Sequence, residues 1–204
     1  ITNAGSGYSK WKEIAVVRWR EDTTKDNHGI FCYIKDVATG KIWSNTYQPT
    51  LHPAKVYEVV FTQGKAEFRR IDYGIETKTE IVISPEDDTE MRRLRITNRN
   101  TTAKVLEFTS YAEVVMASQA SDESHPAFSN LFVQTEILTE QKSIFCTRRP
   151  RSEEEKPPWM FHHMDVHGST VEAISFETDR KQFVGRGNSL TNPQAINQDE
   201  LSGK

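Results

Sequence analysis

Alternation of polar and apolar residues with a period of two is the feature that most constrains this chain. It recurs along most of the sequence, with turn residues between the runs, while apolar stripes of helical period are nearly absent. Successive side chains of a strand point to opposite faces, so the pattern predicts β-structure. The expected strands are 14–19, 30–35, 41–44, 56–62, 65–71, 75–84, 90–98, 104–116, 131–138, 143–147, 160–166, 170–177 and a short piece around Phe183.

Two neighbouring runs predict how a sheet faces solvent. In the run 75–83 the threonine and isoleucine side chains share one face, and two glutamates and a lysine share the other. The run 91–96 places two arginines opposite a leucine and an isoleucine. Adjacent antiparallel strands stabilise each other through opposite charges placed across from one another, so we expect charge pairing on an exposed sheet face.

The number of strands predicts the architecture. A dozen or so strands exceed an immunoglobulin-type domain, so we expect an all-β fold with two large stacked antiparallel sheets. The prediction is one sandwich domain over residues 1–196 and a polar tail over 197–204. The chain opens on Ile1 rather than methionine, and we expect an incomplete fragment of a longer protein. The long segments without a pattern, 119–130 and 150–159, are expected loops.

Charge and apolar content exclude several functions. The chain carries 26 Lys plus Arg against 29 Asp plus Glu, and the basic stretch 148–151 runs directly into the acidic stretch 153–155. This pattern predicts no nucleic-acid partner. No apolar stretch reaches the roughly 18 residues of a membrane helix, so this segment is not expected to span a membrane.

Cys32 and Cys146 lie in apolar runs and are expected to be buried free thiols of a cytoplasmic protein.

The opening segment is the most suggestive candidate site. It contains Gly5, Ser6 and Gly7, small residues that would let backbone N–H groups approach a ligand closely. Tyr8 and Ser9 follow, and the Tyr8 ring could stack on a sugar ring. A tight irregular turn is the alternative interpretation. The segment lacks the strand, glycine-rich turn and helix order of a nucleotide-binding motif.

A histidine cluster is the only candidate metal site. His163, Asp165 and His167 would share one face of a strand, while His162 would point the other way. No Cys-x-x-Cys or His-Glu-x-x-His motif completes a zinc site, so strand histidines near solvent are the simpler interpretation. We expect no metal and no cofactor.

Two acidic pairs are candidate catalytic carboxylates. They are Asp87 with Asp88 and Asp122 with Glu123, the pair type that glycosidases use as acid and base. Both pairs lie in segments expected to be solvated loops, where nothing would raise a carboxyl pKa, so they are interpreted as turn formers. No nucleophile motif is present either, and no catalytic residue is expected in this chain.

The segments 2–9, 15–22 and 34–44 contain separated motifs. They resemble the N-terminal β-sandwich of glycoside hydrolase family 94, formerly glycosyltransferase family 36. The later segments that are similar to the cyclic β-1,2-glucan synthase branch of the family are 82–88, 109–115, 125–136 and 176–180. The matching motifs occur in the right order from Thr2 to about Ile196.

The resemblance implies a fold and a role. It implies a super-β-sandwich of the galactose-mutarotase-like type that serves a glycosyltransferase or glycoside phosphorylase as an accessory, carbohydrate-facing domain. The implied partners are a β-glucan or glucooligosaccharide, a catalytic (α/α)6 barrel that holds the general acid, and a second copy in a homodimer. The parent protein of such a cytoplasmic segment can be anchored in the inner membrane. The residues carried over as substrate-binding or barrel-facing are Gly5, Ser6, Gly7, Tyr8, Ser9, Arg18, Arg20, His125 and Phe128.

Other interpretations stay open at this point. For Arg18 and Arg20 the alternative is an exposed strand face, and for Phe128 it is a core anchor. For the whole chain the alternative is an autonomous carbohydrate-binding module, which needs an exposed aromatic platform. A mutarotase or small hydrolase acting alone would need a histidine and a carboxylate converging in a cleft, and no motif pairs them.

Overall fold

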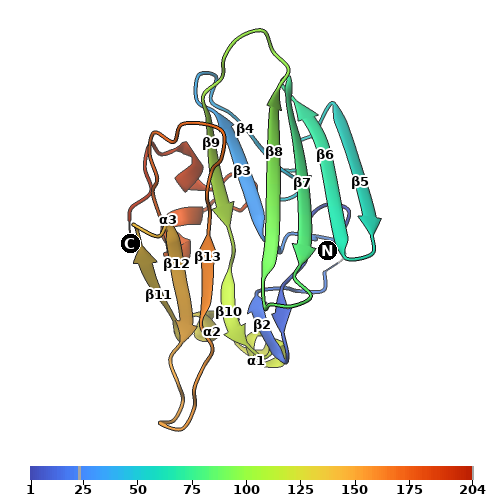
Figure 1. Cartoon of the computed structure of the whole chain (residues 1–204). Coiled ribbons are helices and arrows are strands. Elements are labelled where there is room, and N and C mark those ends of the chain that lie inside the picture. The colour runs from blue at the N-terminus through green and yellow to red at the C-terminus, as the bar shows by residue number, and fades with distance from the viewer. Residues whose placement is uncertain (23, 204) are drawn as a thin grey trace. The chain divides into compact units, whose positions relative to one another are not determined.

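The computed structural model describes residues 1–22 and 24–203, and strands dominate them (Figure 1). All strand pairs are antiparallel, which confirms the expected all-β class. Hydrogen bonds divide the strands of the described residues into four sheets of three or four strands, rather than two large ones. The chain forms two compact units, one of Ile1–Ser9 and Glu21–Ala112 and the other of Lys10–Arg20 and Glu113–Lys204.

The first unit contains two sheets. One has the order β4-β3-β9, and the other the order β5-β6-β7-β8. One core cluster joins Ile34 and Trp43 of the first sheet to Ile75 of the second, and another, within the second sheet, is built from Ala66, Phe68 and Ile81. The strands are β3 (Phe31–Asp36), β4 (Lys41–Ser44), β5 (Val56–Thr62), β6 (Lys65–Asp72), β7 (Ile75–Ile83), β8 (Glu90–Asn98) and β9 (Leu106–Tyr111).

Strands β7 and β8 test the predicted charge pairing. Glu80 lies directly across from Arg93, and the Arg93 Nε lies 2.7 Å from a Glu80 carboxylate oxygen. This contact confirms the prediction. Glu76 was expected on the solvated face but is only 5% exposed, because Arg69 and Arg99 cover its carboxylate.

The second unit combines two small sheets with short helices. Its sheets have the orders β1-β2-β10 and β11-β12-β13. The strands are β1 (Lys10–Trp11), β2 (Ile14–Val17), β10 (Val114–Ala117), β11 (Val133–Leu138), β12 (Ser143–Arg148) and β13 (Met160–His163). The helices are α1 (Gln119–Ser124), α2 (Pro126–Asn130), α3 (Arg180–Val184) and the 3-10 turn η1 (Gln194–Asn197).

The structure corrects three expected elements. The predicted strand 104–116 is two strands, because the chain leaves the β4-β3-β9 sheet after Tyr111 and joins β2 at Val114. The expected loop 119–130 is two short helices, the first capped by Ser118, whose side chain accepts from the Ser121 N–H. The expected strand around Phe183 is helix α3, which the side chain of Asp179 caps.

Two further expectations concern the cysteines and the membrane. Both cysteines are free, as predicted, and Cys146 is buried, whereas Cys32 is only partly buried. Burial raises the pKa of the Cys32 thiol to about 12 and that of Cys146 to about 11, so neither is a reactive thiolate. Within residues 1–22 and 24–203, no helix is long and apolar enough to cross a membrane.

Candidate functional site

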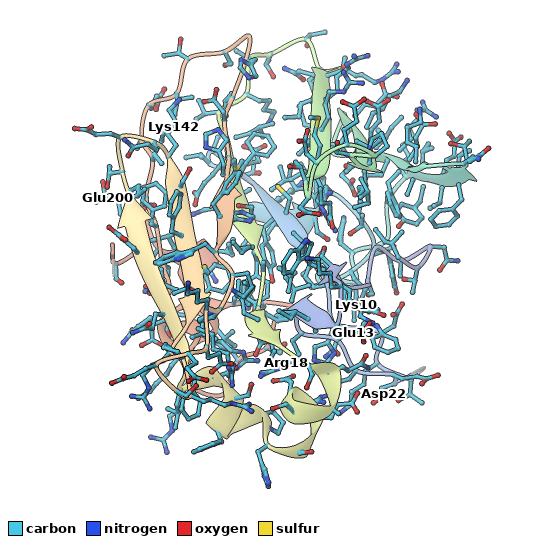
Figure 2. All side chains as sticks on the ribbon, turned by 60° about the horizontal axis from the view of Figure 1, so that its bottom comes forward. Lys10, Glu13, Arg18, Asp22, Lys142 and Glu200 are labelled. Carbon is cyan, nitrogen blue, oxygen red and sulfur yellow. The ribbon has the colours of Figure 1, made fainter. Side chains whose placement is uncertain are left out.

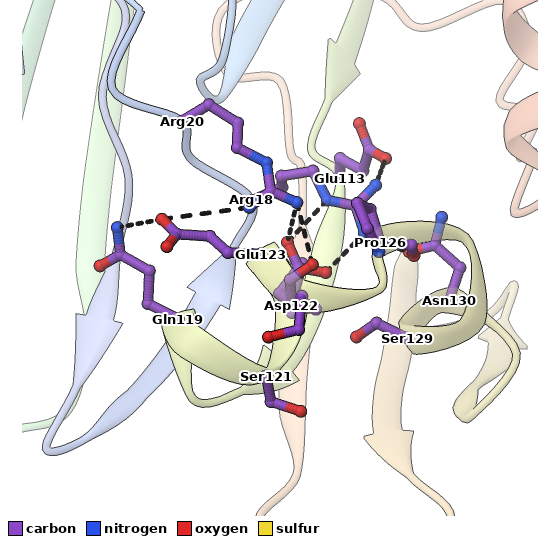
Figure 3. Close-up of polar contacts among 12 residues, drawn as sticks. Arg18, Arg20, Glu113, Gln119, Ser121, Asp122, Glu123, Pro126, Ser129 and Asn130 are labelled. Carbon is purple, nitrogen blue, oxygen red and sulfur yellow. Dashed lines mark hydrogen bonds and ion pairs between the residues drawn. The ribbon is translucent and has the colours of Figure 1, made fainter.

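A buried arginine joins the end of β2 to the helices that follow β10 (Figure 3). Arg18 is 8% exposed, and Asp122 of α1 is 3% exposed. The Arg18 Nε donates to Asp122 Oδ2 at 2.9 Å, and Nη2 donates to Oδ1 at 2.7 Å. This geometry is bidentate, the arrangement in which a guanidinium and a carboxylate bind each other with the most directional specificity.

The same guanidinium also holds α2. Its Nη2 donates to Asn130 Oδ1 at 2.7 Å and to the Pro126 carbonyl at 3.1 Å. Its Nη1 donates to Glu113, the residue just before β10. We call Arg18 and these partners, together with Asp122, the Arg18 network. It fixes both short helices against the β1-β2-β10 sheet, which five- and six-residue helices need because they are too short to be stable alone.

Two other arginines extend the Arg18 network. Arg20 Nη2 donates to the Asp122 carbonyl at 2.9 Å, and Arg180 of α3 donates from Nε to Glu113 at 3.1 Å. In Figure 2 Arg18 lies beside the α1–α2 helices, whereas Lys142 lies at the far end of the β11-β12-β13 sheet. Residues more than 100 positions apart therefore meet at one end of the second unit.

These contacts correct two interpretations of the sequence. Asp122 was expected as a turn former in a solvated loop, but it is the buried acceptor of two arginines. Arg18 does not lie on an exposed strand face, because its partners from α1 and α2 cover it. Arg20 is only partly covered, with 24% of its side chain exposed.

The Arg18 network predicts a pH dependence of stability. Burial acts to raise the pKa of the Asp122 carboxyl, but the hydrogen bond and charge of Arg18 and the charge of Arg20 outweigh it, so the pKa lies below its usual range. A carboxyl whose folded pKa is below the unfolded value of about 3.9 stabilises the fold above that value. This stabilisation is lost as the pH falls through the folded pKa.

Urea unfolding followed by circular dichroism, for the chain and for Asp122→Asn, measures this dependence. We expect the chain to be more stable than Asp122→Asn at neutral pH, and this difference to shrink below about pH 4. A difference that stays constant from about pH 7 to pH 2 would assign the effect of the substitution to causes other than ionisation.

Helix α2 and the residue after it present apolar side chains to solvent. Phe128 is 60% exposed and Leu131 is 75% exposed, and His125 is also exposed. The Phe128 ring packs edge-on against Phe132 at 4.9 Å. Phe128 is therefore not a core anchor. We call His125, Phe128 and Leu131 the α2 surface.

Arg148 supports the α2 surface from inside. Its Nη1 donates to the Val115 carbonyl at 3.0 Å and to the Ser129 carbonyl at 3.1 Å, and its guanidinium carbon lies 5.3 Å from the Phe132 ring centre. Burial lowers the pKa of Arg148, and a guanidinium nevertheless stays charged at neutral pH. Arg148 therefore connects α2, which carries the exposed Phe128, to strand β10 through buried hydrogen bonds.

The opening loop belongs to the first unit and is closed on itself. The N–H groups of Gly5 and Gly7 donate to the carbonyls of Thr2 and His28, at 3.0 and 2.9 Å. Ser6 is fully buried, and its hydroxyl donates to the Asp26 carbonyl. These bonds occupy the N–H groups that a ligand loop would offer, and they match the tight irregular turn that was the alternative interpretation.

The glycine at position 5 is required by close packing. Its φ is +92°, and a Cβ added there would lie 2.3 Å from the Thr46 hydroxyl oxygen. Farther along the loop, Tyr8 is 42% exposed, and the Ser9 hydroxyl donates to Glu90. Among the candidate residues 5–9, Tyr8 is the exposed one.

The histidines near β13 have ordinary partners. His163 Nδ1 lies 3.1 Å from the Ser143 hydroxyl and 3.0 Å from the Gln141 carbonyl. His167 Nε2 lies 3.5 Å from Asp165, and its side chain is 89% exposed. Over the described part of the chain, no three His, Cys, Asp or Glu side chains are grouped so that they could hold a metal ion.

Comparison with known proteins assigns the family. The model of the glycosyl hydrolase 94 supersandwich domain matches residues 1–204. The chain belongs to this family. It is 33% identical over 196 residues to the cyclic β-(1,2)-glucan synthase NdvB of Rhizobium meliloti (strain 1021), covering 96% of this chain and 7% of that protein.

A second relative of the supersandwich domain is the N,N'-diacetylchitobiose phosphorylase of Vibrio furnissii. The identity is 28% over 205 residues, covering 96% of this chain and 24% of the phosphorylase. The chain therefore spans only a small part of either curated relative. These matches confirm the family resemblance that the sequence motifs indicated.

Proposed function

We propose that this supersandwich domain is a non-catalytic, carbohydrate-facing accessory domain of a β-1,2-glucan synthase or phosphorylase. Glycosyl transfer or phosphorolysis is carried out by an (α/α)6 barrel of the parent chain, on the cytoplasmic side of the membrane. The domain docks on that barrel through the α2 surface and completes the rim of its active site. The same sandwich takes part in the contact between the two copies of a homodimer.

One observation carries this proposal: an exposed apolar surface is held rigid by a buried ionic network. Phe128 of α2 and Leu131, the residue after it, are more than half exposed, although Arg18 and Arg148 hydrogen-bond to α2. Large exposed apolar side chains that are well ordered mark interaction sites. A surface ordered before docking loses little conformational entropy on binding, which favours a permanent interdomain contact.

The acidic residues of the site support a structural role. A general acid needs a carboxyl that is protonated near neutral pH, but the pKa of Asp122 is lowered. Its two oxygens are occupied by arginine, so they do not offer a proton to a leaving group. This chemistry favours assigning the acid to another part of the parent protein.

The proposal is tested with Phe128→Ala in the full-length parent protein. Truncating an aromatic anchor at the centre of a contact typically costs enough binding energy for a change of about tenfold or more, so we expect kcat/KM on β-1,2-glucooligosaccharides to fall by about that factor. Leu131→Ala should act in the same direction. Initial rates of product formation measure the effect.

Val60→Ala is the matched control, because Val60 is a 50% exposed apolar residue on β5 of the other unit. It should leave kcat/KM unchanged. Thermal unfolding of each variant separates a docking defect from a folding defect. Full activity of both Phe128→Ala and Leu131→Ala, in proteins that fold, would refute docking through the α2 surface.

A further inference from the structure

Three aromatic rings lie together on one face of the β11-β12-β13 sheet. The Phe145 ring of β12 lies 6.5 Å from the ring centre of Trp159 and 6.1 Å from that of Phe161. Trp159 is 64% exposed and Phe161 is 62% exposed. We call these three residues the aromatic row.

The strand register places polar side chains beside the aromatic row. Phe145 pairs directly with Phe161 on one side and with Glu136 of β11 on the other. Directly paired residues of antiparallel strands share a sheet face, so Glu136 and its exposed neighbour Gln134 border the rings. On the same face of β12, Thr147 and Ser143 are buried, so the exposed part of this face is formed by the rings and by the β11 side chains.

The strand end that carries Trp159 is held in place. The Thr147 hydroxyl of β12 donates to the Pro158 carbonyl at 3.0 Å. Pro157 and Pro158 precede the tryptophan, and proline limits the backbone conformations that would have to be lost on binding. The backbone that carries the indole is therefore held against β12 before any ligand arrives.

The structure assigns the aromatic row as a binding site for a glucooligosaccharide chain, distinct from the docking surface on α2. A pyranose ring has an apolar face of C–H groups and a rim of hydroxyls. The exposed rings can pack against the apolar faces of successive sugars. The carboxylate of Glu136 can accept hydrogen bonds from the sugar hydroxyls, and the amide of Gln134 can both donate to them and accept from them.

A glucan fits this surface better than a protein partner does. The centres of protein interfaces are depleted of charged residues, and here a carboxylate lies directly beside the central ring. The Phe145 and Phe161 rings are tilted by 40° and the Phe145 and Trp159 rings by 59°, so their faces are not parallel. The choice of a β-1,2-linked glucan as the ligand rests on the proposed function.

Isothermal titration of this chain with β-1,2-glucooligosaccharides tests the assignment. We expect binding that weakens by about tenfold or more in Trp159→Ala and in Phe161→Ala, and that is largely kept in Trp159→Phe. Phe61→Ala is the matched control, because Phe61 is a 52% exposed aromatic residue on a strand of the other unit. It should bind like the unchanged chain. Circular dichroism confirms that each variant is folded.

The outcomes separate this inference from the proposed function. Absence of binding, or binding that Trp159→Ala and Phe161→Ala leave unchanged, would overturn the inference even where Phe128→Ala impairs the parent protein. Sugar binding by the aromatic row would stand even where Phe128→Ala has no effect on turnover. Self-association that Trp159→Ala abolishes, without any sugar binding, would also overturn the inference and assign the row to a contact between copies.

Discussion

Replacing Arg18 with methionine is expected to lower the free energy of unfolding by about 3–5 kcal/mol. Methionine keeps the apolar stem but removes the guanidinium that satisfies Asp122, Glu113 and Asn130. Breaking a buried ion pair from one side is costly because the buried Asp122 carboxylate loses its bidentate partner and keeps only the longer contact with Arg20. Urea unfolding monitored by far-ultraviolet circular dichroism measures the loss.

Two further variants identify the cause of that loss. Arg93→Met removes an arginine from a pair whose arginine side chain is 62% exposed, and we expect a much smaller change. Arg18→Met combined with Asp122→Leu removes both charges of the main pair and should be less destabilised than Arg18→Met alone. Equal losses for Arg18→Met and Arg93→Met would mean that burial of the network contributes nothing.

Arg70→Met is the second substitution expected to have a large effect, again about 3–5 kcal/mol. Arg70 and the Asp72 side chain are both fully buried. The Arg70 Nε and Nη2 donate to the Asp72 carboxylate at 2.6 and 2.8 Å, and its other bonds go to the carbonyls of Thr46 and His52. The substitution removes the donor of the buried Asp72 carboxylate and of the His52 carbonyl, whereas the Thr46 carbonyl still accepts from the Ser44 hydroxyl.

The neighbouring residue provides the control for Arg70. Arg69 lies on the opposite face of β6, where its side chain is 32% exposed and pairs with Glu58 and Glu76. Arg69→Met is expected to change the urea midpoint only slightly, because Arg99 still covers Glu76. A loss for Arg69→Met as large as that for Arg70→Met would contradict the assignment of the stabilisation to the buried pair.

The strands were predictable because polar and apolar residues alternate along a strand that has one buried and one solvated face. Strand β7, expected over 75–84, is observed over Ile75–Ile83, and β8 has the expected bounds. The segment 170–177 has β-branched residues but is not a strand in the structure. A strand requires a neighbour that supplies hydrogen bonds, and a local pattern contains no information about that neighbour.

The candidate site was harder to predict for physical reasons. Helices α1 and α2 have six and five residues, too few for an amphipathic period to appear. A charged residue in a strand is normally exposed, and the burial of Arg18 depends on Asp122, 104 positions away. The signal that could have found these helices is local: Ser118 is a good N-cap and Pro126 is favoured in the first helical turn.

Exposure of the aromatic residues could not be read from the sequence either. Trp43 is fully buried, whereas Trp159 is 64% exposed, although both are bordered by apolar and polar residues. Two consecutive prolines precede Trp159 and restrict the backbone there. They are the one sequence signal that this tryptophan follows a stiff segment rather than lying inside a strand. The aromatic row itself depends on the pairing of β12 with β13.

The most direct test of an accessory role compares turnover by this chain with turnover by the full-length parent protein. Both are incubated with β-1,2-glucooligosaccharides and inorganic phosphate, and glucose 1-phosphate and new glucan products are separated by chromatography. We expect products from the full-length protein and none from this chain, because the general acid is assigned to the barrel. Product formation by this chain alone would contradict a non-catalytic role.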